Sequence, residues 1–344
     1  MANPLRRSAA LLAASCSLSS LCAAGGVAIV QPPGAGRPWS APPTTAAMHT
    51  PEGRRPQAPF ASPTLVLAQS GSDNGPKTYV LSKVRQIPHV DKPWTQGLEM
   101  SDDGQLVETS GNYPDGVGSY VRLVDPDSGV TSKRVTAGLA APVFIEGISE
   151  LNGRWFASTY MDHVVIEYDR DFKMVKQHPF PWQGWGLTRS PDGESFLATN
   201  SSEWLLHLDS ENFQLLSAKA VTCRGKTVPG LNELEYVDDF LGQGPAVLGN
   251  VINTRVVLVI DPITARCTGI FHLNDLEPVL ASEQVGHHVA NGIAYNRTNG
   301  NFWFTGKNWD SMFEASIAED TEGSQQQAVS MLDAHMSLLE HPAA

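Results

Sequence analysis

A short phrase recurs five times along the chain, and its first residue differs from copy to copy. The copies are Gln96-Gly97-Leu98, Glu146-Gly147-Ile148, Trp185-Gly186-Leu187, Glu233-Leu234-Glu235 and Asn291-Gly292-Ile293. If each copy opens an equivalent structural unit around an axis, the five lead residues form a ring. Such a ring would carry two carboxylates, two amides and an indole, which can transfer protons, donate hydrogen bonds and enclose a ligand.

A second repeat indicates which elements would position these residues. Apolar or β-prone runs end in Asp125, Asp169, Asp209 and Asp261, at intervals of 44, 40 and 52 residues, and each is followed by turn-rich sequence. Repeats of roughly 40 to 50 residues built from short strands are typical of β-propeller blades. We therefore expect an all-β fold, a five-bladed β-propeller spanning residues 77–318.

The charge of the chain argues against one class of partner. The net charge is −12, and residues 1–76 contain five Arg against two acidic residues, so the remainder is more acidic still. Nucleic-acid binding requires basic patches that neutralise phosphates. We therefore expect no nucleic-acid partner.

The first 76 residues differ in composition from the rest. Arg6 and Arg7 precede an uncharged stretch rich in Ala, Leu, Ser and Gly, and we interpret residues 1–30 as a leader. A signal peptide for the secretory pathway or the extracellular space fits this stretch, and so does a plastid or mitochondrial transit peptide, because no acidic residue precedes Glu52. No stable membrane span is expected in the mature chain. Residues 31–76, rich in Pro, Ala, Gly and Ser, predict a disordered linker.

The tail, residues 319–344, carries a different pattern. Val329, Leu332, Met336 and Leu339 follow a 3-4-3 spacing that predicts an amphipathic helix. Such a helix could dock on the propeller, bind a partner or remain frayed.

Cysteines and histidines give limited information about cross-links and metals. Cys223 and Cys267 could form a disulfide between neighbouring blades in an oxidising compartment, or could remain buried thiols. His287 and His288 are adjacent rather than at the i, i+4 spacing of a helical metal site, so no metal ligands are predicted. A structural calcium ion at one end of the propeller channel is compatible with the Asp-rich turns.

Seven ordered motifs between about Tyr79 and Phe313 resemble those of the plant and bacterial type glutamine cyclotransferases. They are Trp94-Thr95-Gln96-Gly97-Leu98-Glu99, Phe144-Ile145-Glu146-Gly147-Ile148, Gly184-Trp185-Gly186-Leu187-Thr188, Leu231-Asn232-Glu233-Leu234-Glu235-Tyr236, Gly249-Asn250-Val251, Asn291-Gly292-Ile293-Ala294-Tyr295 and Thr305-Gly306-Lys307-Asn308-Trp309. The resemblance implies a five-bladed propeller that converts the N-terminal glutamine of peptides to pyroglutamate and releases ammonia. It also implies peptide or protein substrates and no required cofactor, and we expect a monomer.

Cyclisation needs one group that takes a proton from the attacking amine and gives a proton to the departing ammonia. Glu146 is the candidate, because it leads its phrase, has aromatic neighbours in sequence and matches the glutamate proposed as acid and base in the family. Gln96, Asn232 and Lys307 match polar family positions and would stabilise charge on the γ-oxygen.

The resemblance also implies a substrate pocket formed by Trp94, Phe144, Trp185 and Trp309, with Tyr160 and Asn250 as further substrate-binding positions. Tyr160 and Ile252 stand where the family commonly has Trp, which puts pocket shape and substrate preference in question. Two other functions fit the same residues: a non-catalytic propeller that binds peptides, and a metal-dependent propeller hydrolase or lactonase.

Overall fold

The computed structural model describes residues 64–66, 75–111, 118–136, 138, 143–276 and 288–340, and these residues form mainly β-strands. One helix, α1 (Gln326–Glu340), follows the last strand. The predicted all-β class and the predicted C-terminal helix are therefore confirmed. The predicted leader and most of the predicted linker lie outside the described residues.

Most strands pair with their neighbours in sequence and form antiparallel meanders. The first contains β3 (Thr95–Met100), β4 (Leu106–Ser110), β5 (Tyr120–Val124) and β6 (Thr131–Thr136). The second contains β7 (Ile145–Leu151), β8 (Arg154–Thr159), β9 (Val164–Tyr168) and β10 (Met174–Pro179). The third contains β11 (Leu187–Arg189), β12 (Ser195–Ala198), β13 (Trp204–Asp209) and β14 (Leu215–Ala220).

An eight-stranded sheet joins two further meanders through one parallel pair of strands. One half contains β17 (Leu231–Val237), β18 (Ala246–Val251), β19 (Val256–Ile260) and β20 (Cys267–His272). The other half contains β21 (Ala290–Tyr295), β22 (Phe302–Gly306), β23 (Ser311–Glu319) and β2 (Lys77–Pro88). The pairing of β2 with β23 is antiparallel and joins a strand near residue 80 to one near residue 315, so both ends of the β-domain lie in the same sheet.

Two small elements complete the strands. A hairpin of β15 (Thr222–Cys223) and β16 (Lys226–Thr227) precedes β17. The short strand β1 (Thr64–Val66) pairs parallel with β14, within the segment predicted to be a linker. The unpaired backbone N–H and C=O groups along the edge of β14 can bind any extended segment. This pairing therefore does not require a strand-like sequence pattern in β1.

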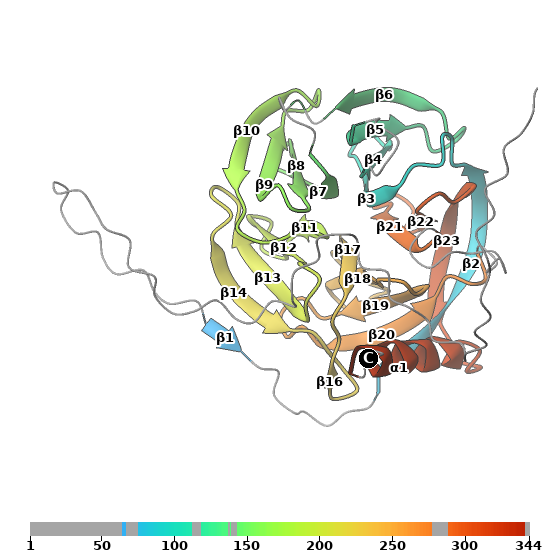
Figure 1. Cartoon of the computed structure of the whole chain (residues 1–344). Coiled ribbons are helices and arrows are strands. Elements are labelled where there is room, and N and C mark those ends of the chain that lie inside the picture. The colour runs from blue at the N-terminus through green and yellow to red at the C-terminus, as the bar shows by residue number, and fades with distance from the viewer. Residues whose placement is uncertain are drawn as a thin grey trace, which may run out of the picture.

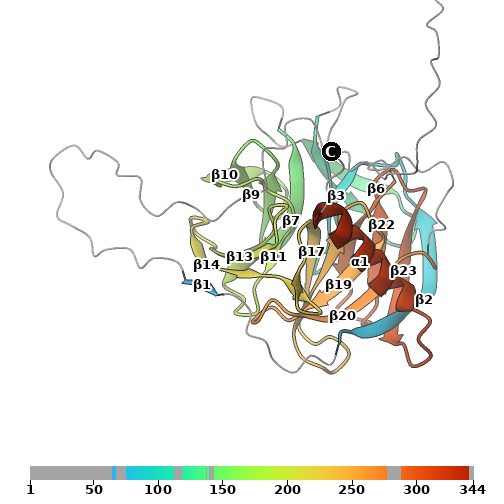
Figure 2. The ribbon, with the colours of Figure 1, turned by 60° about the horizontal axis from the view of Figure 1, so that its bottom comes forward.

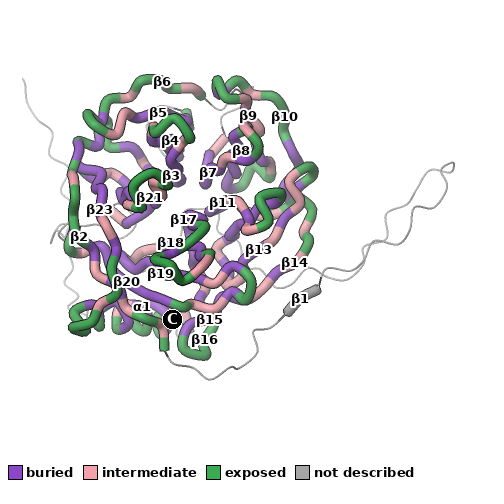
Figure 3. The backbone as a smooth tube through the Cα atoms, turned by 180° about the vertical axis from the view of Figure 1, so that it is seen from behind, coloured by how far each residue is buried: buried purple, intermediate pink, exposed green. Residues whose placement is uncertain are grey.

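The sheets surround a common axis in a propeller-like arrangement (Figure 1). The strands β3, β7, β11, β17 and β21 lie nearest the axis, and each contacts the next around the ring. All residues of β3 and β17 are buried, whereas half-buried and exposed residues alternate along β6 (Figure 3). Inner strands are therefore packed on both faces, and outer strands face water on one side.

The repeated aspartates close the turns that lead into the outer strands. The carboxylate of Asp125 accepts hydrogen bonds from the backbone N–H groups of Asp127 and Ser128. Asp209 and Asp261 accept equivalent bonds in the third meander and in the eight-stranded sheet. The second repeat thus reflects one type of Asx turn, used to connect strands.

Helix α1 packs against β19 and β20 (Figure 2). Val329, Leu332 and Met336 are buried there, as their spacing predicted, and Leu339 is half-buried. Before the helix, the carboxylate of Asp320 accepts a hydrogen bond from the backbone N–H of Gln325. Docking on the β-domain is therefore the role that the structure gives the tail.

Cys223 and Cys267 are thiols in this structure and do not form a disulfide, which was one of the two predicted states. Both belong to the apolar cluster beneath α1, where a thiol packs as a small hydrophobic group. Within the described ranges, no helix combines the length and the apolar character that crossing a membrane would need.

Candidate active site

The recurring phrases coincide with irregularities at the start of the inner strands. Four inner strands shift register against their partners at this point. The shifts lie between Thr95 and Gly97, Ile145 and Ile148, Leu231 and Leu234, and Ala290 and Ile293. A β-bulge interrupts the regular alternation of side chains between the two faces of a sheet and changes the direction of the side chains within it. The phrases therefore mark positions where one side chain of the inner strand departs from that alternation.

The fourth copy of the phrase begins one residue earlier than the sequence pattern suggested. The shift between Leu231 and Leu234 encloses Asn232 and Glu233, as the shift in β7 encloses Glu146 and Gly147. Asn232 is therefore the lead residue, and Glu233 occupies the glycine position. The prediction that Glu233 leads this copy is wrong.

The glycine position faces the neighbouring phrase across a very short gap. A Cβ atom on Gly97 would lie 2.7 Å from the backbone nitrogen of Ile148, and one on Gly147 would lie 2.6 Å from the carbonyl oxygen of Trp185. Both distances are below those found for real Cβ contacts. Glycine lets the phrases pack directly against one another around the axis.

Glu233, which stands where other copies have glycine, connects three inner strands through hydrogen bonds. Its carboxylate oxygens accept hydrogen bonds from the backbone N–H groups of Leu98 (3.4 Å) and Ile293 (3.0 Å). Burial, and then the nearby Glu235, raise the pKa of Glu233 well above its usual value. The carboxyl group of Glu233 thus links β17 to β3 and β21.

Hydroxyl groups at or just after the end of the second strand of a meander hold the lead residues by their carbonyl groups. Thr109 donates to the carbonyl oxygen of Glu146, and Thr199 donates to that of Asn232 at 2.7 Å. Ser158 donates to the carbonyl oxygen of Trp185 at 3.0 Å. Sequence reasoning missed these residues, although Thr or Ser recurs near the end of each of these second strands and could have identified them.

Glu146 and Lys307 form the main electrostatic pair of the site. Glu146 is buried, and burial raises the pKa of its carboxyl group to about 8 although the charge of Lys307 opposes the shift. Burial likewise lowers the pKa of Lys307 to about 8, against the effect of Glu146. The Nζ atom of Lys307 lies 5.5 Å from the ring centre of Trp94. The structure therefore brings an ionisable carboxyl group, an ionisable amine and an aromatic ring into one environment.

The two predicted amide donors are both buried at the same level of the ring. Asn232 is anchored through its carbonyl oxygen, as described above. The side-chain oxygen of Gln96 accepts a hydrogen bond from Nδ2 of Asn291 at 3.1 Å. Asn291, for which sequence reasoning found no role, thus contacts a predicted catalytic residue.

The predicted pocket residues fall into two groups. Trp94 and Phe144 are half-buried, and Phe144 packs edge to face with Tyr160 at 5.9 Å. Trp185 is largely buried, and its indole nitrogen has no hydrogen-bond partner among the described residues. These four aromatic residues can form the walls of a pocket.

Trp309 and Asn250 occupy more interior positions than predicted. Trp309 belongs to the apolar core, contacts Phe313, and donates its indole N–H to the carbonyl oxygen of His288 at 3.2 Å. Asn250 is fully buried and accepts a hydrogen bond from the backbone N–H of Gly292 at 3.2 Å. The side chains of both residues are therefore held in the interior of the domain.

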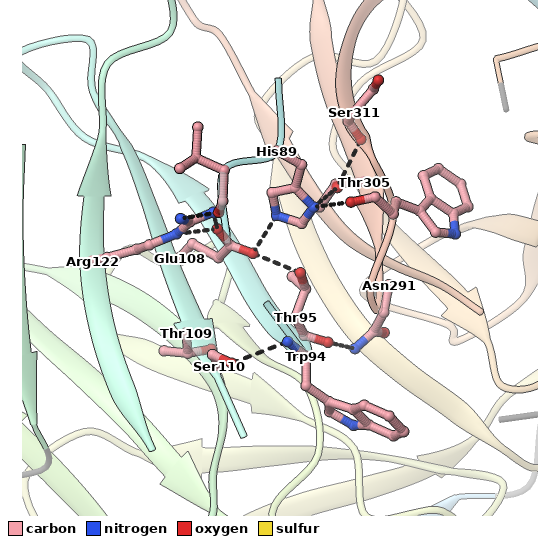
Figure 4. A network of polar contacts seen from close by, with 12 residues as sticks. His89, Trp94, Thr95, Glu108, Thr109, Ser110, Arg122, Asn291, Thr305 and Ser311 are labelled. Atoms are coloured by element: carbon pink, nitrogen blue, oxygen red, sulfur yellow. Dashed lines mark hydrogen bonds and ion pairs between the residues drawn. The ribbon is translucent and has the colours of Figure 1, made fainter. Parts of the chain in front are cut away.

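A buried ionic network lies beside the site (Figure 4). Glu108 accepts hydrogen bonds from Arg122 (2.7 Å) and Thr95 (2.6 Å) and contacts His89 (2.9 Å). Burial opposes ionisation of Glu108, but Arg122 and then His89 outweigh it and hold its pKa at about 2. Among the described residues, no three His, Cys, Asp or Glu side chains are grouped so that they could hold a metal ion.

The chain is similar to known proteins in sequence and in fold. The family model described as glutamine cyclotransferase matches residues 59–317. A glutaminyl-peptide cyclotransferase of Arabidopsis thaliana is 28% identical over 241 residues, which cover 69% of this chain and 71% of the relative. The crystal structure of Myxococcus xanthus glutaminyl cyclase has a similar fold, with a TM-score of 0.63 and 23% identity over 71% of this chain and 99% of that chain. The chain belongs to the glutamine cyclotransferase family.

Proposed function

We propose that this enzyme converts the N-terminal glutamine of peptides or proteins to pyroglutamate and releases ammonia. Its family and its Arabidopsis relative support the activity. The observation that carries the mechanism is the buried carboxyl group of Glu146, whose pKa lies near 8 beside Lys307. A group with this pKa can both accept and donate a proton near neutral pH.

We further propose that the propeller has five blades. The three separate meanders would each form one blade, and the two halves of the eight-stranded sheet would form the fourth and fifth. The contacts between consecutive inner strands from β3 to β21, and from β21 back to β3, support this division.

In the proposed reaction, the neutral α-amine of the substrate attacks the carbon of its own γ-carboxamide. A C–N bond forms, and the Glu146 carboxylate takes a proton from the attacking nitrogen. The bond to the original amide nitrogen then breaks as the Glu146 carboxylic acid returns the proton to it, so that ammonia leaves and the carbonyl group forms again. One carboxyl group thus serves as base and then as acid, and ends in its starting state.

Charge that develops on the γ-oxygen during attack would be met by three groups. Lys307 supplies a cation, and Gln96 and Asn232 supply amide N–H donors. Because all three are buried, their interactions with the transition state are stronger than they would be in water. Trp94, Phe144, Tyr160 and Trp185 would enclose the glutaminyl end of the substrate.

The proposed chemistry uses only these side chains and calls for no metal. Purified full-length protein should release ammonia from a glutaminyl peptide in the presence of a chelator and yield the pyroglutamyl product. Peptide binding without ammonia release would favour the non-catalytic propeller. Lactone hydrolysis that chelators abolish, without cyclisation, would favour the metal-dependent hydrolase.

A further inference from the structure

The side-chain amide of Asn291 lies against three oxygen atoms of Thr95 and Gln96. Its Nδ2 atom is 2.9 Å from the carbonyl oxygen of Thr95, 3.3 Å from that of Gln96 and 3.1 Å from Oε1 of Gln96. Asn291 has no exposed surface, so water does not compete for these contacts. One buried amide therefore links the start of β21 to the backbone and the side chain of Gln96.

These contacts fix the orientation of both amides by elimination. The two backbone carbonyl oxygens can only accept hydrogen bonds, so the Asn291 atom that faces them must be the NH2 group. The same NH2 group faces the Gln96 side chain, which must therefore present its oxygen. The Nε2 group of Gln96 is consequently directed away from β21. Because β3 lies between β21 and β7, the next inner strand on the other side is the one that carries Glu146.

A rigid framework supports Asn291 and its partners (Figure 4). The hydroxyl group of Thr95 donates to Glu108, which is held in turn by Arg122. After Asn291, Gly292 has a φ of 112°, and its backbone N–H donates to the side-chain oxygen of Asn250. The Asn291 amide is thus restrained by its own strand and by the strand it contacts, which is the support that a pre-oriented donor requires.

We propose that Asn291 is a positioning residue that holds the Gln96 amide with its NH2 group toward the substrate. The inference rests on the proposed function, since it assigns the Gln96 NH2 group to the γ-oxygen that gains charge during cyclisation. Without Asn291, the Gln96 amide can rotate and present its oxygen, which repels that charge.

The test is a double-mutant cycle between Asn291 and Gln96. In Asn291→Asp, the NH2 group is replaced by a carboxyl oxygen that can donate at most one hydrogen bond, so the three oxygen atoms compete for it and Oε1 of Gln96 is no longer held. We expect kcat for ammonia release to fall about 10²-fold, as for loss of one oxyanion donor, with KM changed less than about threefold. In a Gln96→Ala background, the same substitution should lower kcat by less than about threefold. Asn291→Ala, taken through the same cycle, gives an independent result if the Asp variant does not fold.

Asn212→Asp is the matched control, because Asn212 lies in an exposed turn where its side-chain oxygen accepts a hydrogen bond that Asp can also accept. It should keep wild-type kcat and KM. Losses that are equal in the wild-type and Gln96→Ala backgrounds would overturn the positioning role, as would a wild-type kcat in both Asn291 variants. If the wild-type protein itself releases no ammonia, the proposed function fails instead, so the two failures are distinguishable.

Discussion

Replacing Gly147 by alanine tests whether direct contact between neighbouring phrases positions the active site. A Cβ atom at this position would lie 2.6 Å from the carbonyl oxygen of Trp185, and ordinary contact begins at 3.4 Å. The inner strands would have to separate by roughly 0.8 Å next to Glu146, and displacements of about 1 Å can cost about 100-fold in rate. We expect kcat to fall about tenfold to 100-fold, and the free energy of unfolding to fall by about 1 to 3 kcal/mol.

The measurement combines steady-state ammonia release with thermal or denaturant unfolding of the same samples. Gly118→Ala is the control, because no atom of the described residues lies within 4 Å of a Cβ built on Gly118. It should retain wild-type kcat and stability. A Gly147→Ala protein with wild-type kcat and stability would refute the account of the ring, because it would mean that the close approach at Gly147 positions nothing.

Three further predictions concern buried ionisable groups. Glu108→Ala leaves Arg122 buried without its counter-ion and should lower the free energy of unfolding by about 3 to 5 kcal/mol. The control Glu319→Ala removes an exposed ion pair and should change this free energy little. Equal losses for the two variants in denaturant titrations would contradict the importance of the buried network. The kcat for cyclisation should pass through a maximum near pH 8. The reaction requires the Glu146 carboxylate, which forms as pH rises, and the Lys307 ammonium, which is lost as pH rises, and burial brings the pKa of each group to about 8. A kcat that stays constant from about pH 6 to about pH 9 would contradict this. Burial lowers the pKa of His335 below its usual 6.5, so the folded state binds its proton less well than the unfolded state, and stability is lost as pH falls below that value. The protection factors of the α1 amides, which correct for the slower intrinsic exchange at low pH, should therefore fall on acidification. An equal fall in His335→Gln would show that this reasoning is wrong.

The sequence predicted the repeat because glycine and aspartate recur in most of its units for the same physical reasons. Gly97 and Gly147 are required by close packing around the axis, and Asp125 and its equivalents close turns within a few residues. Such requirements recur in most units and are visible as periodic residues. The all-β class and the buried face of α1 also followed from periodic patterns.

The exceptions to the repeat could not be predicted in this way. Glu233 stands where other copies have glycine because its carboxylate accepts hydrogen bonds from two distant inner strands. Without a glycine as a marker, the sequence comparison aligned Glu233-Leu234-Glu235 with the other phrases, one residue later than the register shift in β17. The role of Asn291 depends on its contacts with Thr95 and Gln96, which precede it by 196 and 195 residues. A single phrase contains no signal for contacts at this distance in sequence.

The buried network of His89, Glu108 and Arg122 shows the same limit. Each residue alone has the sequence context of an ordinary strand or turn position, and Glu108 and Arg122 meet only because β4 and β5 pair in a specific register. For the pocket, Trp309 matched a family position, but only the fold showed that it packs into the core. Residue type indicated the chemistry available, and tertiary contacts determined which residues can use it.

The most direct test of the central claim is kcat for ammonia release by Glu146→Gln at about pH 8, where the proposed proton-transfer group titrates. Glu99→Gln is the matched control, because Glu99 is also a buried inner-strand carboxyl group whose pKa is raised, to about 7, by burial. With both proteins shown to be folded, Glu146→Gln should lose about 10²-fold to 10⁴-fold in kcat, and Glu99→Gln should lose little. Normal turnover by folded Glu146→Gln would contradict the assignment of Glu146 as the acid and base of this reaction.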